Sequence, residues 1–181
     1  MDLADPRDAL NDLQTAIAAV LLPASFDPAT PAAFDKVAVF DLQNLAVAME
    51  ELFAYSNRIA LIALDAVDHN SSVLGRTLRV AQSLSITILF SDRRYSDRQK
   101  ALMGDSTTPG ALFLQTLLVN AVTGELPNGG VVQPRAGRLV ALENADRTNE
   151  TGRIVFAQDF DVATSWDAIS SSRNARLAAA A

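Results

Sequence analysis

The sequence predicts an α+β fold, in which a single mixed, mainly antiparallel sheet packs against two or three helices. Apolar residues recur at helical spacing in the segments 10–21, 42–53 and 110–123. Short apolar or alternating segments lie between and after them, and such segments are typical of β-strands. In the second half these segments follow one another closely, as the strands of hairpins do. Helices that interleave with hairpin-linked strands favour one sheet backed by helices.

The first predicted element is a helix that begins at Asp5-Pro6. Aspartate is a favoured N-cap, proline is tolerated at the first helical position, and Asp8 adds an acid to the first turn. Its apolar stripe consists of Leu10, Leu13, Ile17, Val20 and Leu21. Three prolines between residues 23 and 31 end the helix. We therefore assign residues 1–22 to an N-terminal helix and 23–35 to a loop.

A short strand and an amphipathic helix are predicted next. The apolar run 37–40 suits an edge strand, and Asp41 is placed to cap a following helix. In that helix one stripe is apolar, while Glu50 and Glu51 face away from it. The stripe consists of Leu42, Leu45, Ala46, Met49, Leu52 and Phe53.

Two strands should follow. The segment 58–64 is apolar on both faces, as expected of a strand inside a sheet that is covered on both sides. The polar segment 65–76 is expected to be a loop. From Leu78 to Phe90 apolar and polar residues alternate, which predicts a half-buried strand.

The last third predicts a helix and a hairpin. Thr108-Pro109 marks a start for a largely apolar helix over 110–123, and Gly124 is suited to end it. Residues 125–137 are expected to form a loop, and two strands should flank a turn at 149–152. Trp166 is expected to plug the core or anchor the tail, with an interface role as the second choice. We thus expect one domain, residues 1–165, and a C-terminal tail, residues 166–181.

Composition and charge exclude several classes of function. The chain has 181 residues and a net charge of −6, which argues against non-specific nucleic-acid binding. Residues 1–56 hold nine acids and two bases, whereas the rest is close to neutral, and such asymmetry suits self-association. With no cysteine there is no disulfide, thiolate metal site or cysteine nucleophile. The start lacks a signal peptide's basic region, and no apolar run is long enough to span a membrane, so we expect a cytoplasmic, soluble protein.

The segment around the single histidine is the strongest candidate for chemistry. His69 lies beside Asp68 and close to Ser71 and Ser72, so the residue types of a Ser-His-Asp catalytic triad are present. Asp65 could join Asp68 and His69 as a metal ligand. A charged surface loop explains these residues equally well, and triads are recognised by spatial roles. The glycines of "LPNGGVV" lack the spacing of phosphate-binding loops, so we expect a turn there and no cofactor.

A mixed charge cluster after the alternating strand is the main candidate contact surface. Acids interleave with the bases there, which suits salt bridges across a protein interface better than an anion site. An ordinary solvated loop and small-anion binding remain the alternatives. The candidate interface residues are Arg93, Arg94, Tyr95, Arg98, Lys100, Arg147 and Glu150, on a loop 91–108 and a hairpin tip 146–152.

Residues 36–165 resemble a family of Mu-like prophage proteins encoded among tail-assembly genes. The shared pattern includes Gly110 at a helix start, Leu118 followed by Gly124, and the turn 149–152. It ends in the aromatic-Gln-aromatic run 156–160. The acidic first helix and the alanine-rich tail depart from the pattern.

The resemblance implies a tail-terminator or tail-completion protein, a structural ring subunit that caps the tail tube. It carries over no catalytic residue and no cofactor. Expected partners are other copies of the chain and neighbouring tail or neck proteins, first in the cytoplasm of the bacterial host and then in the virion tail. A small-ligand-binding or hydrolytic enzyme that uses the Asp68-His69 segment, or a cytoplasmic regulatory interaction domain, remains the alternative.

Overall fold

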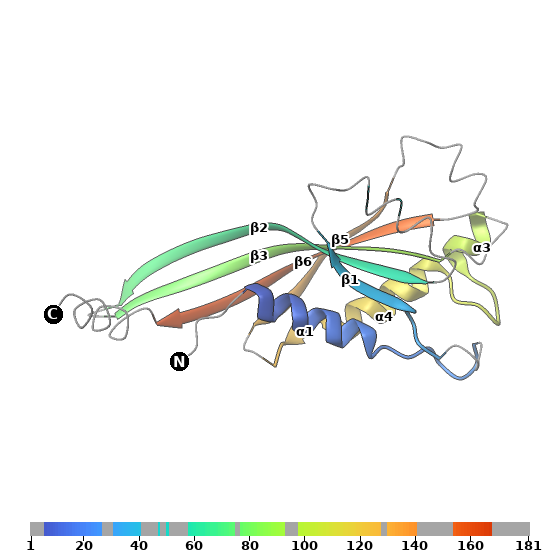
Figure 1. The fold of residues 1–181 in the computed structure, drawn as a ribbon, viewed down its shortest axis with the longest axis horizontal. Helices are drawn as coiled ribbons and strands as arrows, with labels where there is room; N and C mark the ends of the chain where they lie inside the picture. Colours follow the sequence, from blue (N-terminus) through green and yellow to red (C-terminus); the bar gives the residue numbers. More distant parts are fainter. Residues whose placement is uncertain are drawn as a thin grey trace.

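The chain forms one mixed six-stranded sheet with helices packed on it, which confirms the predicted α+β class (Figure 1). The computed structural model describes residues 6–26, 31–40, 47, 50, 58–74, 77–92, 98–127, 130–140 and 154–167. The described helices are α1 (Pro6–Ala18), α3 (Arg98–Met103) and α4 (Ala111–Val122). The strands are β1 (Lys36–Phe40), β2 (Ile59–Leu74), β3 (Thr77–Asp92), β4 (Gly124–Glu125), β5 (Val131–Leu139) and β6 (Ile154–Asp167).

The sheet is mainly antiparallel, and its strand order is β1-β2-β3-β6-β5-β4. Only β1 and β2 are parallel; β2, β3, β6 and β5 pair antiparallel in that order. The predicted edge strand at 37–40 is confirmed as β1. The predicted strand at 58–64 is confirmed as the first part of β2, which lies between β1 and β3.

The main core lies on the sheet face that carries α1 and α4 (Figure 1). Helix α1 contributes Leu13 and Ile17 to it, and α4 contributes Leu114 and Leu118. These pairs are spaced by four residues, so each falls on one side of its helix. The helix predicted at 110–123 is therefore confirmed, although Gly110, rather than Thr108, is its N-cap.

The opposite sheet face carries a smaller buried apolar cluster. Ile59 and Leu61 of β2, Leu89 of β3, and Val155 and Ala157 of β6 form it. Adjacent residues of β2 thus face opposite cores, which explains why the segment 58–64 is apolar at nearly every position.

The loop predicted at 65–76 is wrong over most of its length, because β2 continues to Leu74 and pairs with β3 throughout. Every residue from Asp65 to Ser72 is exposed, so the segment needs no apolar side chains to be a strand. The backbone hydrogen bonds to β3 hold it in place, and a hydrophobic pattern could not reveal them.

Two further loop predictions are also wrong. Most of 125–137 belongs to β5, whose side chains are exposed at every position but Val132. Within the loop predicted at 91–108, residues 98–103 form α3. The helix predicted at 42–53, the turn at 149–152 and the tail lie almost entirely outside the described residues; Val47 and Glu50 are helical.

A short connection, residues 104–110, joins α3 to α4 and fixes where α4 begins. The Oδ1 atom of Asp105 accepts hydrogen bonds at 2.9 Å from the backbone N–H groups of Thr107 and Thr108, and from the Thr107 hydroxyl. Gly104 has a φ of 76°, and a Cβ there would lie 2.5 Å from the nitrogen of Gly110. The connection therefore depends on glycine at 104 and on a carboxylate at 105.

Replacing Asp105 with alanine is expected to lower the melting temperature at neutral pH and to have little effect in acid. The backbone hydrogen bond from Thr107 is the largest reason that the pKa of Asp105 lies below its ordinary value of 3.8. Because the folded-state pKa is lowered, this stabilisation is present above the ordinary value and is lost as the pH falls through the folded value. Melting curves of the wild type and the variant at about pH 7 and about pH 3 measure it. An equal difference at both values would show that ionisation of Asp105 is irrelevant.

Candidate interaction surface

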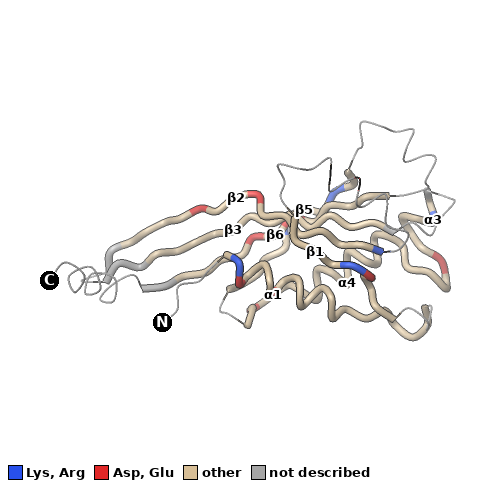
Figure 2. Tube along the Cα trace, viewed as in Figure 1, with Lys and Arg blue, Asp and Glu red and all other residues tan. Residues whose placement is uncertain are grey.

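The part of the sheet that extends beyond the helices is a three-stranded arm (Figure 1). We define the arm as residues 66–74 of β2, 77–85 of β3 and 162–167 of β6, which pair as one antiparallel ribbon. At its base, Leu84 and Val162 still belong to the main core, and Val162 and Ala163 also pair with β5. The β2 portion includes Asp68 and no lysine or arginine, and Figure 2 shows acidic but no basic residues along β2. Polar side chains on an exposed ribbon predict contact with water or with another polypeptide.

His69 lies in the arm as part of a row across three strands. Its Nε2 atom is 3.1 Å from Nε2 of Gln82, whose Oε1 accepts a hydrogen bond of 3.3 Å from the hydroxyl of Thr164. Gln82 and Thr164 are both buried. A hollow of about 460 Å³ lies beside this row and also touches Asp68 and Val131.

The arrangement of β2 separates the residues of the predicted catalytic set. Asp68 and His69 are consecutive in a strand, so their side chains leave opposite faces of the ribbon. Among the described residues no group of three histidine, cysteine or carboxylate side chains converges as a metal site would require. The predicted metal set Asp65, Asp68 and His69 is therefore not brought together.

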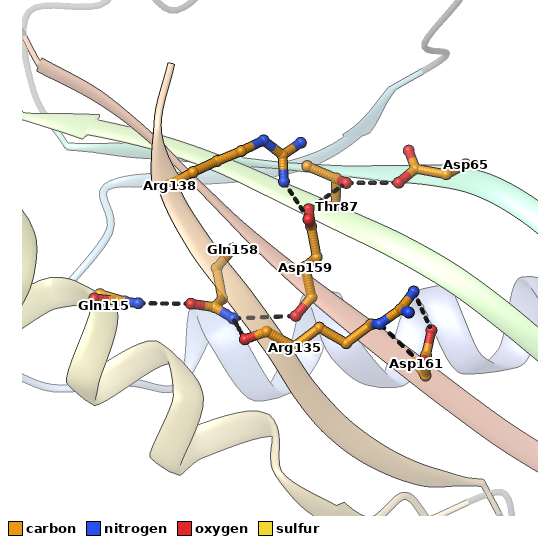
Figure 3. A network of polar contacts seen from close by, with 8 residues as sticks. All are labelled: Asp65, Thr87, Gln115, Arg135, Arg138, Gln158, Asp159 and Asp161. Atoms are coloured by element: carbon orange, nitrogen blue, oxygen red, sulfur yellow. Dashed lines mark hydrogen bonds and ion pairs between the residues drawn. The ribbon is translucent and has the colours of Figure 1, made fainter. Parts of the chain in front are cut away.

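Asp65 instead joins a polar network at the root of the arm (Figure 3). The Thr87 hydroxyl lies 2.6 Å from a carboxylate oxygen of Asp65 and 2.8 Å from one of Asp159. Arg138 forms an ion pair with the second oxygen of Asp159. One hydroxyl proton serves only one carboxylate at a time, so Arg138 supplies the second interaction that Asp159 needs.

A second ion pair continues this network along the same face. Arg135 lies 3.3 Å from Asp161, and the hydroxyl of Ser85 is 3.5 Å from the same carboxylate. Asp159 and Asp161 alternate with the buried Phe160 and so point away from the main core. Two arginines of β5 thus balance the carboxylates of Asp159 and Asp161 on β6, and these ion pairs link the two strands.

On the core face, Gln158 links α4 to an irregular part of β5 (Figure 3). It accepts a hydrogen bond of 2.7 Å from Gln115 and donates one of 2.8 Å to the carbonyl of Arg135. The register of β5 against β6 shifts between Pro134 and Gly137, which leaves that carbonyl available to a side chain. Gln158 is 1% exposed, so its polar groups depend on these partners.

Most residues of the predicted contact cluster lie outside the described part of the chain. This holds for Arg93, Arg94, Tyr95, Arg147 and Glu150.

The two remaining members lie on α3. Arg98 begins the helix, and Lys100 is exposed on it. The structure thus places two of the seven predicted contact residues on one short helix, at the end of the sheet away from the arm (Figure 1).

Sequence reasoning missed the residues that form the polar networks. The alternation of Asp159 and Asp161 with Phe160 was a visible signal that both acids share the face opposite the main core. No such signal was visible for the two arginines. Arg135 lies in the segment predicted to be a loop, 125–137, and Arg138 begins the predicted strand that follows it.

Neither a comparison with protein-family models nor a search of curated proteins finds a match to this chain. In the described segments, no helix has the length and hydropathy needed to cross a lipid bilayer.

Proposed function

We propose that this protein is a structural subunit of a phage or prophage tail, of the tail-terminator or tail-completion type, and that it works as a homo-oligomeric ring. The observation that carries the proposal is the arm, where seven consecutive residues of β2, 66–72, are exposed on both faces of a ribbon. Exposed strands offer their side chains and, at the edges, their backbone groups to other chains, so an extended ribbon favours a protein whose task is to contact other polypeptides.

The polar groups of the described sheet support an assembly role over catalysis. Asp159, Asp161 and Gln158 each have partners within the fold, and His69 is hydrogen-bonded in its row. A ring further needs two different complementary surfaces on each subunit, since each contact is head-to-tail. The difference in charge between residues 1–56 and the rest of the chain is one source of such surfaces.

Light scattering behind a sizing column, over a range of concentrations and with negative-stain images of each peak, tests the proposal. A closed ring with a central hole is the expected result. A monomer at every concentration contradicts self-assembly of the isolated chain. A tight two-fold dimer favours the ligand-binding alternative below.

Replacing Arg93 and Arg94 with glutamate is expected to disturb assembly and to leave the melting temperature nearly unchanged. Charge reversal turns attraction across an interface into repulsion, while surface substitutions rarely alter stability by more than about 0.5 kcal/mol. The same sizing column and a melting curve provide both readouts. If assembly and melting fail together, the two arginines serve folding.

A small-ligand or hydrolytic role at the Asp68-His69 segment is the second candidate, and the hollow beside the His69 row favours it. A broad hydrolase screen of the wild type and of His69→Ala tests it. Activity that the substitution abolishes supports this candidate. Activity that survives unchanged removes it.

A further inference from the structure

We propose that neighbouring copies join through the arm, with the β2 edge of one copy adding as a parallel strand to the β6 edge of the next. The inference rests on the proposed ring and names the surface that closes it. A strand edge offers unpaired N–H and C=O groups to another strand, and proteins usually block edges that are not used. The open edges of the described sheet differ in how far they are blocked.

Two of the described edges are blocked. Strand β1 has five residues, begins with a lysine, and the side-chain amide of Gln14 donates a hydrogen bond of 3.0 Å to the carbonyl of Val37. Strand β5 contains Pro134, which has no N–H, and its edge also carries Arg135, Arg138 and the register shift. Short length, proline, charge and bulges are the usual means of preventing edge-to-edge pairing.

The β2 edge of the arm lacks these features, and the open β6 edge, residues 164–167, has short length but no proline, lysine, arginine or register shift. Beyond Ala63, the partner of Phe40, β2 has no described strand on its outer side. Its residues 66–74 contain no proline, lysine or arginine, and their pairing with β3 is regular. On the other side of the arm, no described strand pairs with β6 beyond Ala163, the partner of Val131.

The directions and positions of the two edges fit a head-to-tail contact. Both β2 and β6 are antiparallel to β3, so they run in the same direction. Rotation about a ring axis that lies roughly along the strands keeps this direction, so β6 of one copy meets β2 of the next in parallel. The two open stretches also lie at one level, because Asn70 and Ser165 both pair with Ala81. Each copy then offers one edge and receives the other, which is what a closed ring requires.

The absence of native cysteine allows a direct test with introduced pairs. Ser165→Cys is combined in turn with Asp68→Cys, Asn70→Cys and Ser72→Cys, three exposed positions that alternate along one face of β2. Within one copy Asn70 and Ser165 lie on either side of β3, about 9–10 Å apart, which is too far for a disulfide. Oxidation can therefore link these positions only between copies.

The expected result is a ladder of disulfide-linked oligomers from at least one double variant, while each single-cysteine variant stays monomeric on a denaturing gel. Gln133→Cys on the blocked β5 edge, combined with Asn70→Cys, is the control and should give no ladder. A dimer formed by a single-cysteine variant would overturn the inference in favour of two-fold pairing. If light scattering shows rings but no double variant gives a ladder, the arm contact is wrong and the ring proposal stands. If neither rings nor ladders form, both are overturned.

Discussion

Replacing Phe90 with alanine is expected to lower the free energy of unfolding by about 3–5 kcal/mol, the usual cost of removing a large buried aromatic side chain. Phe90 is fully buried in β3 and contacts two other rings. Its centroid lies 5.9 Å from that of Phe34 in an edge-on arrangement and 5.4 Å from that of Phe156 in a stacked one. The substitution therefore removes buried area and both ring contacts, and it leaves a cavity between the sheet and the segment before β1.

Urea denaturation monitored by circular dichroism measures this effect. Leu112→Ala is the control, because Leu112 is on α4 but 38% exposed, and it should cost less than about 1 kcal/mol. Similar losses for both variants would mean that Phe90 is not at the centre of the core.

Replacing Gln158 with leucine is expected to lower the free energy of unfolding by about 2–3 kcal/mol, although leucine is the more apolar residue. The substitution leaves the carbonyl of Arg135 and the amide of Gln115 without their partner in a partly buried site. A polar group that is buried without a partner costs about 1–3 kcal/mol.

A double-mutant cycle separates this effect from a change of shape. Gln115→Leu removes the other end of the link, so Gln115→Leu and Gln158→Leu together should cost less than the sum of the two single changes. The expected coupling is about 1 kcal/mol. Additive costs would show that the two glutamines do not act as a pair.

The elements that were predicted correctly are those in which apolar side chains face a core and polar side chains face the solvent. The alternation from Leu78 to Phe90, the two-faced apolar run at 58–64 and the stripe of α1 each record which side faces a core. These patterns were sufficient for the α+β class and for the edge position of β1.

The elements that were missed owe their structure to backbone pairing. Residues 66–72 and 133–139 are all exposed, so burial imposes no hydrophobic pattern on them. Pro134 also argues against a strand, and only the shifted register on an open edge accommodates it. For the candidate site, the sequence located Asp65 and His69 but could not show that they belong to separate networks.

The bulge between Leu64 and Ala66 has a consequence for how the arm can vary. Before it, even-numbered residues of β2 share a face with the main core; after it, odd-numbered residues such as His69 do. Asp65 is therefore the extra residue at which the alternation of side chains between the two faces of β2 shifts by one position. Removing Asp65 would let Leu64 and Ala66 follow one another opposite Ile86 and Ser85, so the arm would keep its present faces. If Asp65 paired with Ser85 instead, Ala66 would lie opposite Leu84 and the β2 portion of the arm would present its other face, so the bulge decides which side chains the arm offers to a partner.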